Sequence, residues 1–183
     1  MSNSMEQLYQ QVILDHSKHP NGKGLVDLTD DLLGGESHQV NPTCGDEVTM
    51  RVMFEGTGGD RTISKVSWDG QGCSISQASI SILTDLVEGK KVSEAEAVAE
   101  LFRDLMNTRG KGFADDDAEA EDKEDQLGDA TAFTGVSKFP ARIKCALLGW
   151  SALRDTFAKT GALADAQAAT VTGTGGVHEP HGE

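Results

Sequence analysis

Two stretches of alternating apolar and polar residues constrain the fold of this chain more than any other feature of its 183 residues. They span residues 48–54 and 63–68, and the sequence EGTGGD lies between them. Alternation with a period of two is typical of a half-buried strand, and a short glycine-containing loop joins adjacent strands. We therefore predict an antiparallel hairpin. In the following WDGQGCSIS, Gly70 and Gly72 predict a turn into a short third strand, with Cys73 on or beside it.

Four segments have the periodicity of amphipathic helices and carry recognisable start and stop signals. They run from a Ser4/Gln7 capping box to about His16, over residues 77–88 up to Gly89, from a Ser93/Glu96 capping box to NTRGKG, and from Pro140 to Gly161. The fourth helix places Cys145 in its first turns. Helices and a hairpin in one chain predict an α+β fold.

The length and the 37% hydrophobic content suit one globular domain, which we assign to residues 1–161. Residues 162–183 are rich in Ala, Gly and Thr and lack aromatic side chains, so we expect a mobile tail. His178 and His181 in this tail are expected to be adventitious metal binders only. The N-terminus has no basic stretch followed by an apolar run, and no apolar run of about eighteen residues occurs. The predicted location is the cytoplasm.

The formal net charge of −14 is concentrated in one segment. DDDAEAEDKEDQLGD, residues 115–129, holds nine acids and one lysine and so contributes −8 of the total. We interpret it as a solvated acidic insertion, a loop without a specific docking role. The remaining charge does not provide the broad basic surface that nucleic acid requires, and this class of partner is discounted.

The three cysteines, at positions 44, 73 and 145, are too far apart for a local zinc knuckle. An odd number of thiols cannot pair completely, and a reducing compartment disfavours disulfides. One interpretation makes each cysteine a small buried hydrophobe. The other brings all three to one site, which the whole fold must then assemble.

The neighbours of Cys44 and Cys73 favour a common site. Cys44 lies between Pro42 and Gly45 on a sharp turn, and Cys73 follows the glycine-containing GQG. Asp46 is either a turn cap or the oxygen ligand that a three-cysteine site lacks. In the second case the ligands would be three thiolates and one carboxylate.

Four separated blocks then resemble one known family. LYQQVILDHSKHPNGKG, NPTCGDEV, GQGCSISQAS and FPARIKCALLGW lie in the order found in the U-type iron–sulfur cluster assembly proteins, which include IscU and the N-terminal domain of NifU. The resemblance covers about residues 8–157. Lys144 stands where IscU-type scaffolds carry a histidine, and an insertion precedes the third cysteine. Both features are similar to the SufU branch of the family.

The resemblance implies an IscU-like α+β fold, a three-stranded antiparallel sheet with helices packed on one face. It also implies Zn²⁺ as the cofactor, bound by Cys44, Asp46, Cys73 and Cys145. The implied partner is a SufS-type cysteine desulfurase, whose pyridoxal phosphate belongs to the partner. Persulfide sulfur would pass from it to this chain and then to a downstream iron–sulfur scaffold.

Cys44 and Arg142 are assigned roles in the chemistry, and Lys144 is considered beside them. Cys44 is the expected sulfur acceptor, because a turn can swing outwards while strand and helix ligands cannot easily do so. Around a divalent ion the four ligands leave a charge of about −2, which a nearby cation would help to hold. Arg142 and Lys144 are placed for this, although each also suits a solvated helix start. His16 and His19 receive no catalytic role, and the position of the His38 ring stays open.

Three functions remain open: a zinc-dependent sulfurtransferase that accepts persulfide, a scaffold on which an iron–sulfur cluster is built, and a module with purely structural zinc. Lys144 in place of histidine argues against the scaffold, because the site then has one candidate ligand fewer. Asp46 argues against the structural module, because closed structural zinc sites favour Cys and His ligands. The first function is therefore preferred.

Overall fold

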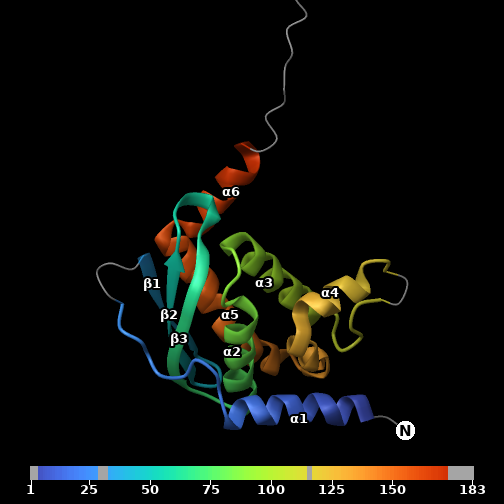
Figure 1. Ribbon diagram of the computed structural model, residues 1–183. Coiled ribbons are helices and arrows are strands. Elements are labelled where there is room, and N and C mark those ends of the chain that lie inside the picture. Colours follow the sequence, from blue (N-terminus) through green and yellow to red (C-terminus); the bar gives the residue numbers. More distant parts are fainter. Residues whose placement is uncertain (1–3, 29–32, 115–116, 173–183) are drawn as a thin grey trace, which may run out of the picture.

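The computed structural model describes residues 4–28, 33–114 and 117–172 and is organised around one antiparallel sheet (Figure 1). Its three strands lie in the order β1-β2-β3, with bounds Leu33–Asn41, Asp46–Glu55 and Thr62–Gln71. The predicted hairpin is confirmed as β2 and β3, and a one-residue irregularity between Met53 and Phe54 shifts its register. The predicted α+β class and the three-stranded antiparallel sheet are also confirmed.

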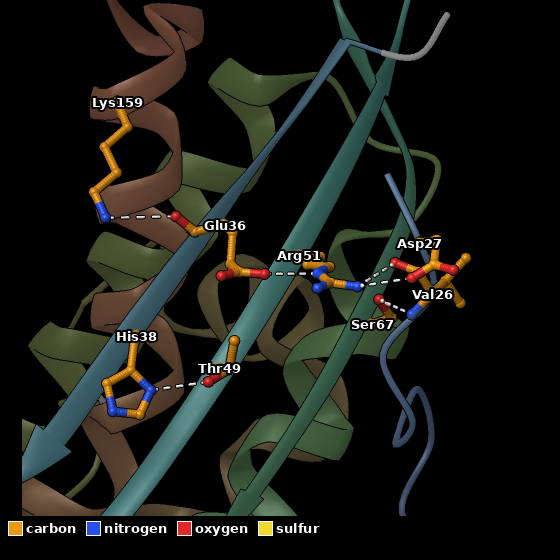
Figure 2. A network of polar contacts seen from close by, with 8 residues as sticks. All are labelled: Val26, Asp27, Glu36, His38, Thr49, Arg51, Ser67 and Lys159. Carbon is orange, nitrogen blue, oxygen red and sulfur yellow. Dashed lines mark hydrogen bonds and ion pairs between the residues drawn. The ribbon is translucent and has the colours of Figure 1, made fainter. Parts of the chain in front are cut away.

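The alternation of β2 separates a buried face from a polar one. Val48, Met50 and Val52 are fully buried, whereas the residues between them point away from the core. Figure 2 shows the polar face, where Arg51 Nε donates to Glu36 Oε2 at 2.6 Å. Helices therefore cover one face of the sheet only. Polar side chains that contact one another line the other face.

The helices have the bounds α1 Ser4–Lys18, α2 Ser74–Val87, α3 Val92–Asn107, α4 Ala120–Leu127, α5 Pro140–Thr160 and α6 Ala162–Thr172, with short 3-10 segments η1 Gly58–Asp60 and η2 Gly128–Lys138. The predicted start of α5 at Pro140 and its stop at Gly161 are confirmed. Helix α5 packs along β1 and β2 and against α2, while α1 crosses one end of α2 (Figure 1). None of the helices in the described ranges is long and apolar enough to cross a bilayer.

Aromatic side chains link the helices into a common core. The rings of Phe102 and Trp150 stack with centroids 4.7 Å apart, and Phe133 meets Phe102 edge to face at 5.7 Å. The indole N–H of Trp150 donates to Ser79 Oγ at 3.1 Å, so its buried polar atom has a partner. This core fixes α5 against α2 and α3, and thereby fixes the position of Cys145.

The predicted third strand is wrong. The structure has no strand at Cys73, and the third strand is β1, which the periodicity did not predict. Its sequence, LGGESHQVN, is polar and carries two adjacent glycines. A side chain at Gly35 would collide with Thr160 of α5, so the close approach of β1 to this helix requires a residue that weakens the strand signal.

The expected acidic loop is partly wrong. Residues 120–127 form α4, and a 3-10 segment follows. Leu127 is fully buried and anchors the helix, while the acidic side chains of α4 remain exposed and solvated as predicted. Lys123 pairs with Asp117 at 2.7 Å across the start of this helix. A single apolar anchor was too weak a signal to reveal a helix among so many charges.

The expected mobile tail is also wrong for residues 162–172, which form α6, while residues 173–183 lie outside the described part of the chain. Ala162 and Ala166 are buried at 1% and 2% exposure, and Asp165 pairs with Arg61 at 3.1 Å. Alanine side chains bury little surface each, so their contribution is not visible as an apolar face. Helix α6 packs beside η1 at the end of the sheet away from the β3–α2 junction (Figure 1).

We expect Ala166→Asp to lower the free energy of unfolding by at least about 2 kcal/mol, because it places a charge against the core. Ala164→Asp, on the exposed side of α6, adds the same charge and is the matched control. Urea unfolding followed by circular dichroism measures both. Equal stabilities of the two variants would show that α6 does not belong to the folded unit.

Candidate metal centre

Four potential ligands converge from three separate junctions of the fold. Cys44 lies on the turn between β1 and β2, and Asp46 is the first residue of β2. Cys73 occupies the N-cap position of α2, two residues after the end of β3, and Cys145 lies in the second turn of α5. The sheet end and the starts of two helices therefore meet at one place, as a site assembled by the whole fold requires.

The distances define a compact cluster. Cys44 Sγ lies 3.6 Å from Cys145 Sγ, and ligand atoms of Cys44, Asp46 and Cys145 lie within 4.8 Å of one another. Cys73 joins this group through the carboxylate, since its Sγ is 3.5 Å from Asp46 Oδ2 and its N–H donates to Asp46 Oδ1 at 3.3 Å. Asp46 is thus the central member of the set.

Two of the four potential ligands are buried and two are exposed. Asp46 and Cys145 are 5% and 6% exposed, whereas Cys44 and Cys73 are exposed. Burial tends to raise the pKa of Asp46, but hydrogen bonds from the thiols, that of Cys145 foremost, and from the Cys73 N–H outweigh it and lower that pKa. Asp46 is therefore held as a carboxylate.

The pKa of Cys145 is shifted the other way. Burial raises the pKa of its thiol, and the hydrogen bonds with Cys44 and Asp46 raise it further. Without a cation this cluster therefore keeps Cys145 protonated beside a carboxylate. A divalent cation would reverse that balance, because metal coordination deprotonates a thiol outright. Three sulfur donors and one carboxylate oxygen also suit the tetrahedral preference of Zn²⁺.

A glycine permits the contact between Cys73 and Asp46. A methyl group at Gly72 would collide with Ser76 Oγ and lie 3.1 Å from Asp46 Cγ. Ser76 Oγ–H itself donates to the Cys73 carbonyl oxygen at 3.0 Å, which closes the first turn of α2. The GQG sequence before Cys73 is thus explained by close packing around the carboxylate.

We expect Gly72→Ala to lower the free energy of unfolding by about 1–3 kcal/mol and to weaken metal binding, because the methyl group pushes Cys73 away from Asp46. Gly135→Ala is the control, since a Cβ at that position meets nothing within 4 Å. Thermal unfolding and metal titration of both variants provide the measurement. A Gly72→Ala protein that binds metal as tightly as the control would refute this role.

Asn41 belongs to the site although the sequence analysis did not assign it. Its side chain is buried, and its Oδ1 accepts the Thr43 N–H at 3.1 Å. Its backbone oxygen accepts the Gly45 N–H at 2.8 Å, so this residue holds both sides of the Cys44 turn. An Asn two residues before Thr in NPTCGD is the signal that could have identified it.

The basic residues expected near the metal lie at the rim. Arg142 is exposed, with its guanidinium carbon 4.9 Å from the centroid of the Phe139 ring, and Lys144 is also exposed. Within the described residues no contact joins either side chain to a thiol. Arg142 lies one turn before Cys145 on the same side of α5. The structure therefore places the positive charge beside the cluster, not in it.

The histidines lie elsewhere. His38 is on the polar face of the sheet, where its ring is 2.8 Å from Thr49 Oγ1 and 3.7 Å from Glu47 (Figure 2 shows the first contact). His16 lies between Ser81 Oγ at 2.8 Å and Asp129 at 3.4 Å and connects α1 to the fold. His178 and His181 are outside the described residues.

A groove is lined in part by Ile75 and Arg142, which lie close in sequence to Cys73 and Cys145. It has a volume of about 640 Å³ and runs between α1, η2 and the start of α5. Apolar residues from α1 and α2, among them Met5, Tyr9 and Ile75, line it together with Phe139 and Arg142. Met5 and Phe139 are 59% and 49% exposed, which is unusual for large apolar side chains so close together.

Comparison with known proteins identifies one family. Residues 8–146 match the family model described as the NifU-like N terminal domain. The chain is 40% identical over 156 residues to the zinc-dependent sulfurtransferase SufU of Bacillus subtilis, covering 85% of this chain and 93% of that protein. It is 36% identical over 157 residues to the iron–sulfur cluster assembly scaffold protein IscU of Streptococcus pyogenes, covering 85% and 86%.

Solved structures agree on the fold. FiSufU from Fervidobacterium islandicum superimposes with a TM-score of 0.61 at 31% identity, covering 84% of this chain and 98% of that one. A NifU-like N-terminal protein from Brucella abortus gives a TM-score of 0.64 at 19% identity, covering 87% and 98%. The second likeness supports the fold alone.

Proposed function

This chain belongs to the NifU-like N-terminal domain family of iron–sulfur cluster assembly, and on that premise we propose that it is a zinc-dependent sulfurtransferase. It accepts persulfide sulfur from a SufS-type cysteine desulfurase at Cys44 and passes it to a cluster assembly scaffold. The relative named for this activity shares 40% identity with it. The observation that carries the proposal is an exposed thiol, Cys44, on a turn beside a buried thiol and a carboxylate.

The four clustered residues would hold the zinc: Cys44, Asp46, Cys73 and Cys145. Zinc has no redox chemistry of its own and would keep the thiols deprotonated near neutral pH. The convergence of these side chains supports this ligand set, because three thiols and a carboxylate gathered at one place have no evident role in packing. Asp46 supplies the hard oxygen donor and is already held as a carboxylate.

Among the three thiols, Cys44 suits the acceptor role best. Cys145 is buried and fixed by α5. Cys73 is exposed but is tied by its N–H to Asp46 and lies at the start of α2. Cys44 lies on a short turn held at its base by Asn41, so its side chain can move outwards without unfolding an element.

Arg142 is proposed to assist at the rim of the site. Its guanidinium lies one helical turn from Cys145 and stacks on Phe139, at the border of the apolar groove. There it would attract the negative charge of an incoming persulfide. The exposed apolar residues of the groove would let the desulfurase bury surface near the start of α5, which carries Cys145.

The relative named IscU supports a second candidate, a scaffold on which a cluster is assembled. Lys144, the residue before Cys145, argues against it. Its ammonium group is not a cluster ligand and faces solvent. A structural zinc site is disfavoured by the exposure of Cys44 and Cys73, since structural sites are closed.

The test combines metal analysis with enzyme turnover. Protein isolated without a histidine tag is expected to hold about one zinc per chain, and chelation should lower its melting temperature. Added to a cysteine desulfurase and cysteine, it should raise turnover and acquire a persulfide on Cys44, detected by mass spectrometry. A [2Fe–2S] absorption spectrum in freshly isolated protein would favour the scaffold instead.

A further inference from the structure

The side-chain nitrogen of Asn41 is a buried donor that lacks a partner among the described residues. Asn41 is 6% exposed, and its Nδ2 makes no hydrogen bond to any of them. Its Oδ1 accepts the Thr43 N–H at 3.1 Å, which fixes the orientation of the amide, because a flipped amide would set two donors against each other. Buried polar groups are almost always hydrogen-bonded, so this nitrogen requires an acceptor.

The strand register places this nitrogen beside the candidate metal ligands. Asn41 is the last residue of β1 and lies directly opposite Asp46, the first residue of β2. Residues directly opposite each other in an antiparallel pair point to the same face, with Cβ atoms about 4.5–5.5 Å apart. Both side chains are buried, and the helix that packs against β1 and β2 is α5, which carries Cys145. The Asn41 amide therefore lies next to the Asp46 carboxylate.

The Asp46 carboxylate can accept a further hydrogen bond. A carboxylate offers about four acceptor positions. In the described contacts Oδ1 accepts the Cys73 N–H at 3.3 Å, and Oδ2 lies 3.5 Å from the Cys73 sulfur. As a metal ligand, Asp46 would direct one oxygen at the ion and leave the other with free lone pairs. Carboxylates that ligate metals are themselves hydrogen-bonded as a rule.

We propose that Asn41 is a positioning residue of the metal centre, whose Nδ2 donates to the free carboxylate oxygen of Asp46 when Asp46 holds the metal. The inference rests on the proposed function, in which Asp46 is one of the zinc ligands. It gives the two ends of one amide two separate tasks. Oδ1 shapes the turn that carries Cys44, and Nδ2 orients Asp46.

This division of tasks suits sulfur transfer. When Cys44 moves outwards, the metal must be held by the remaining ligands, of which Asp46 is the only oxygen donor. A carboxylate can turn about its side-chain bonds, and a donor fixed by the turn would restrict that rotation. Loss of such an outer-shell partner typically lowers metal affinity by about 10–100-fold.

Replacement of Asn41 by aspartate separates the two tasks. Asn41→Asp has the same shape and keeps an oxygen for the Thr43 N–H, but it loses the N–H donor and adds a negative charge. The charge alone would strengthen binding of a cation, whereas loss of the donor should weaken it. We expect the zinc dissociation constant, measured by competition with a chelator, to rise at least about tenfold.

Thr43→Asp is the matched control for charge. It adds the same charge to an exposed position of the same turn and keeps the Asn41 amide, so it should bind zinc at least as tightly as wild type. Circular dichroism establishes that each variant is folded. An Asn41→Asp protein that binds zinc as tightly as wild type, or more tightly, would show that Asn41 only caps the turn.

Nuclear magnetic resonance of isotopically labelled wild-type protein tests the hydrogen bond without relying on the folding of a variant. One Nδ2 proton of Asn41 should shift downfield when zinc is added, because a hydrogen bond to a carboxylate is strong. Asn21 is the internal reference, since its Nδ2 already donates to Asp85 Oδ2 at 2.7 Å, and zinc should leave its resonances unchanged. Asn41 amide resonances that do not respond to zinc would overturn the inference.

Cys44→Ala identifies the acceptor. This variant keeps Asp46 but lacks the sulfur on the turn, so zinc should still shift the Asn41 amide proton. Loss of the shift in zinc-loaded Cys44→Ala would assign the acceptor to the Cys44 sulfur and refute the role of Asp46.

The outcomes separate this inference from the proposed function, because none of these measurements uses a desulfurase. Wild-type protein that binds zinc without a change at the Asn41 amide would defeat the inference alone. Protein that shows the change, yet never acquires a persulfide on Cys44 from a desulfurase, would defeat the proposed function alone. Wild-type protein that binds no zinc would defeat both.

Discussion

Replacing Cys44 by alanine is expected to abolish sulfur transfer, by at least about a hundredfold, while zinc stays bound. The substitution removes the proposed nucleophile, and no other thiol of the cluster combines exposure with a position on a turn. Asp46, Cys73 and Cys145 remain, and three protein ligands completed by water suffice for a zinc site. Loss of activity should therefore separate from loss of metal.

The measurement is zinc content and desulfurase turnover of the same preparation, with persulfide mapped on each thiol. Thr43→Ala is the neighbouring control, because Thr43 uses only its backbone N–H in the described contacts of the turn and its side chain is exposed. It should retain both zinc and transfer. If zinc-loaded Cys44→Ala stimulates the desulfurase as wild type does, the acceptor is another residue.

Local signals in the sequence predicted much of this fold. Strict alternation located β2 and β3, and Pro140 and Gly161 marked the two ends of α5. These signals work because each reflects one physical preference: burial of one strand face, a fixed backbone angle, or freedom at a helix end. Where one preference dominates, a single sequence is enough.

The errors fall where local signals conflict with packing. Strand β1 contains Gly34 and Gly35, which lower strand propensity but allow α5 to approach. Helix α6 buries alanines, whose contribution depends on the fit to η1 and not on hydrophobicity. Cys73 was predicted on or beside a third strand because its glycines resemble a turn between strands. In the structure those glycines lead into α2.

The candidate site was predictable in composition but not in geometry. The cysteines and Asp46 were identified from their local turns and from the family resemblance. That Cys44 and Cys145 are in contact, and that Cys73 reaches them through Asp46, depends on how β1, β2 and α5 pack. For Arg142 the sequence was misleading about geometry. Its positive charge suggested a position beside the metal, but in the structure its guanidinium lies over the ring of Phe139.

Replacing Cys145 by alanine is expected to have the opposite effect to the change at Cys44, with zinc affinity lowered by at least about a hundredfold. Both variants lose one thiolate, but Cys145 is the one that α5 fixes within reach of both Cys44 and Asp46. Cys44, which lies on a turn and not on a helix, would then lack the helix-held sulfur beside it. A ligand that the fold already holds in place loses less entropy when it binds a metal. Removing such a ligand therefore lowers the zinc affinity more than removing a less ordered one.

Competitive titration with a chelator and melting curves with and without zinc measure this difference. Zinc should raise the melting temperature of Cys44→Ala but leave that of Cys145→Ala almost unchanged, because a metal stabilises the folded state only as far as it binds there. Lys144→Ala, an exposed neighbour on the same helix, should retain the wild-type response. If Cys145→Ala binds zinc as tightly as Cys44→Ala, then α5 does not supply the fixed ligand, and the turn that carries Cys44 must be ordered enough to hold the metal itself.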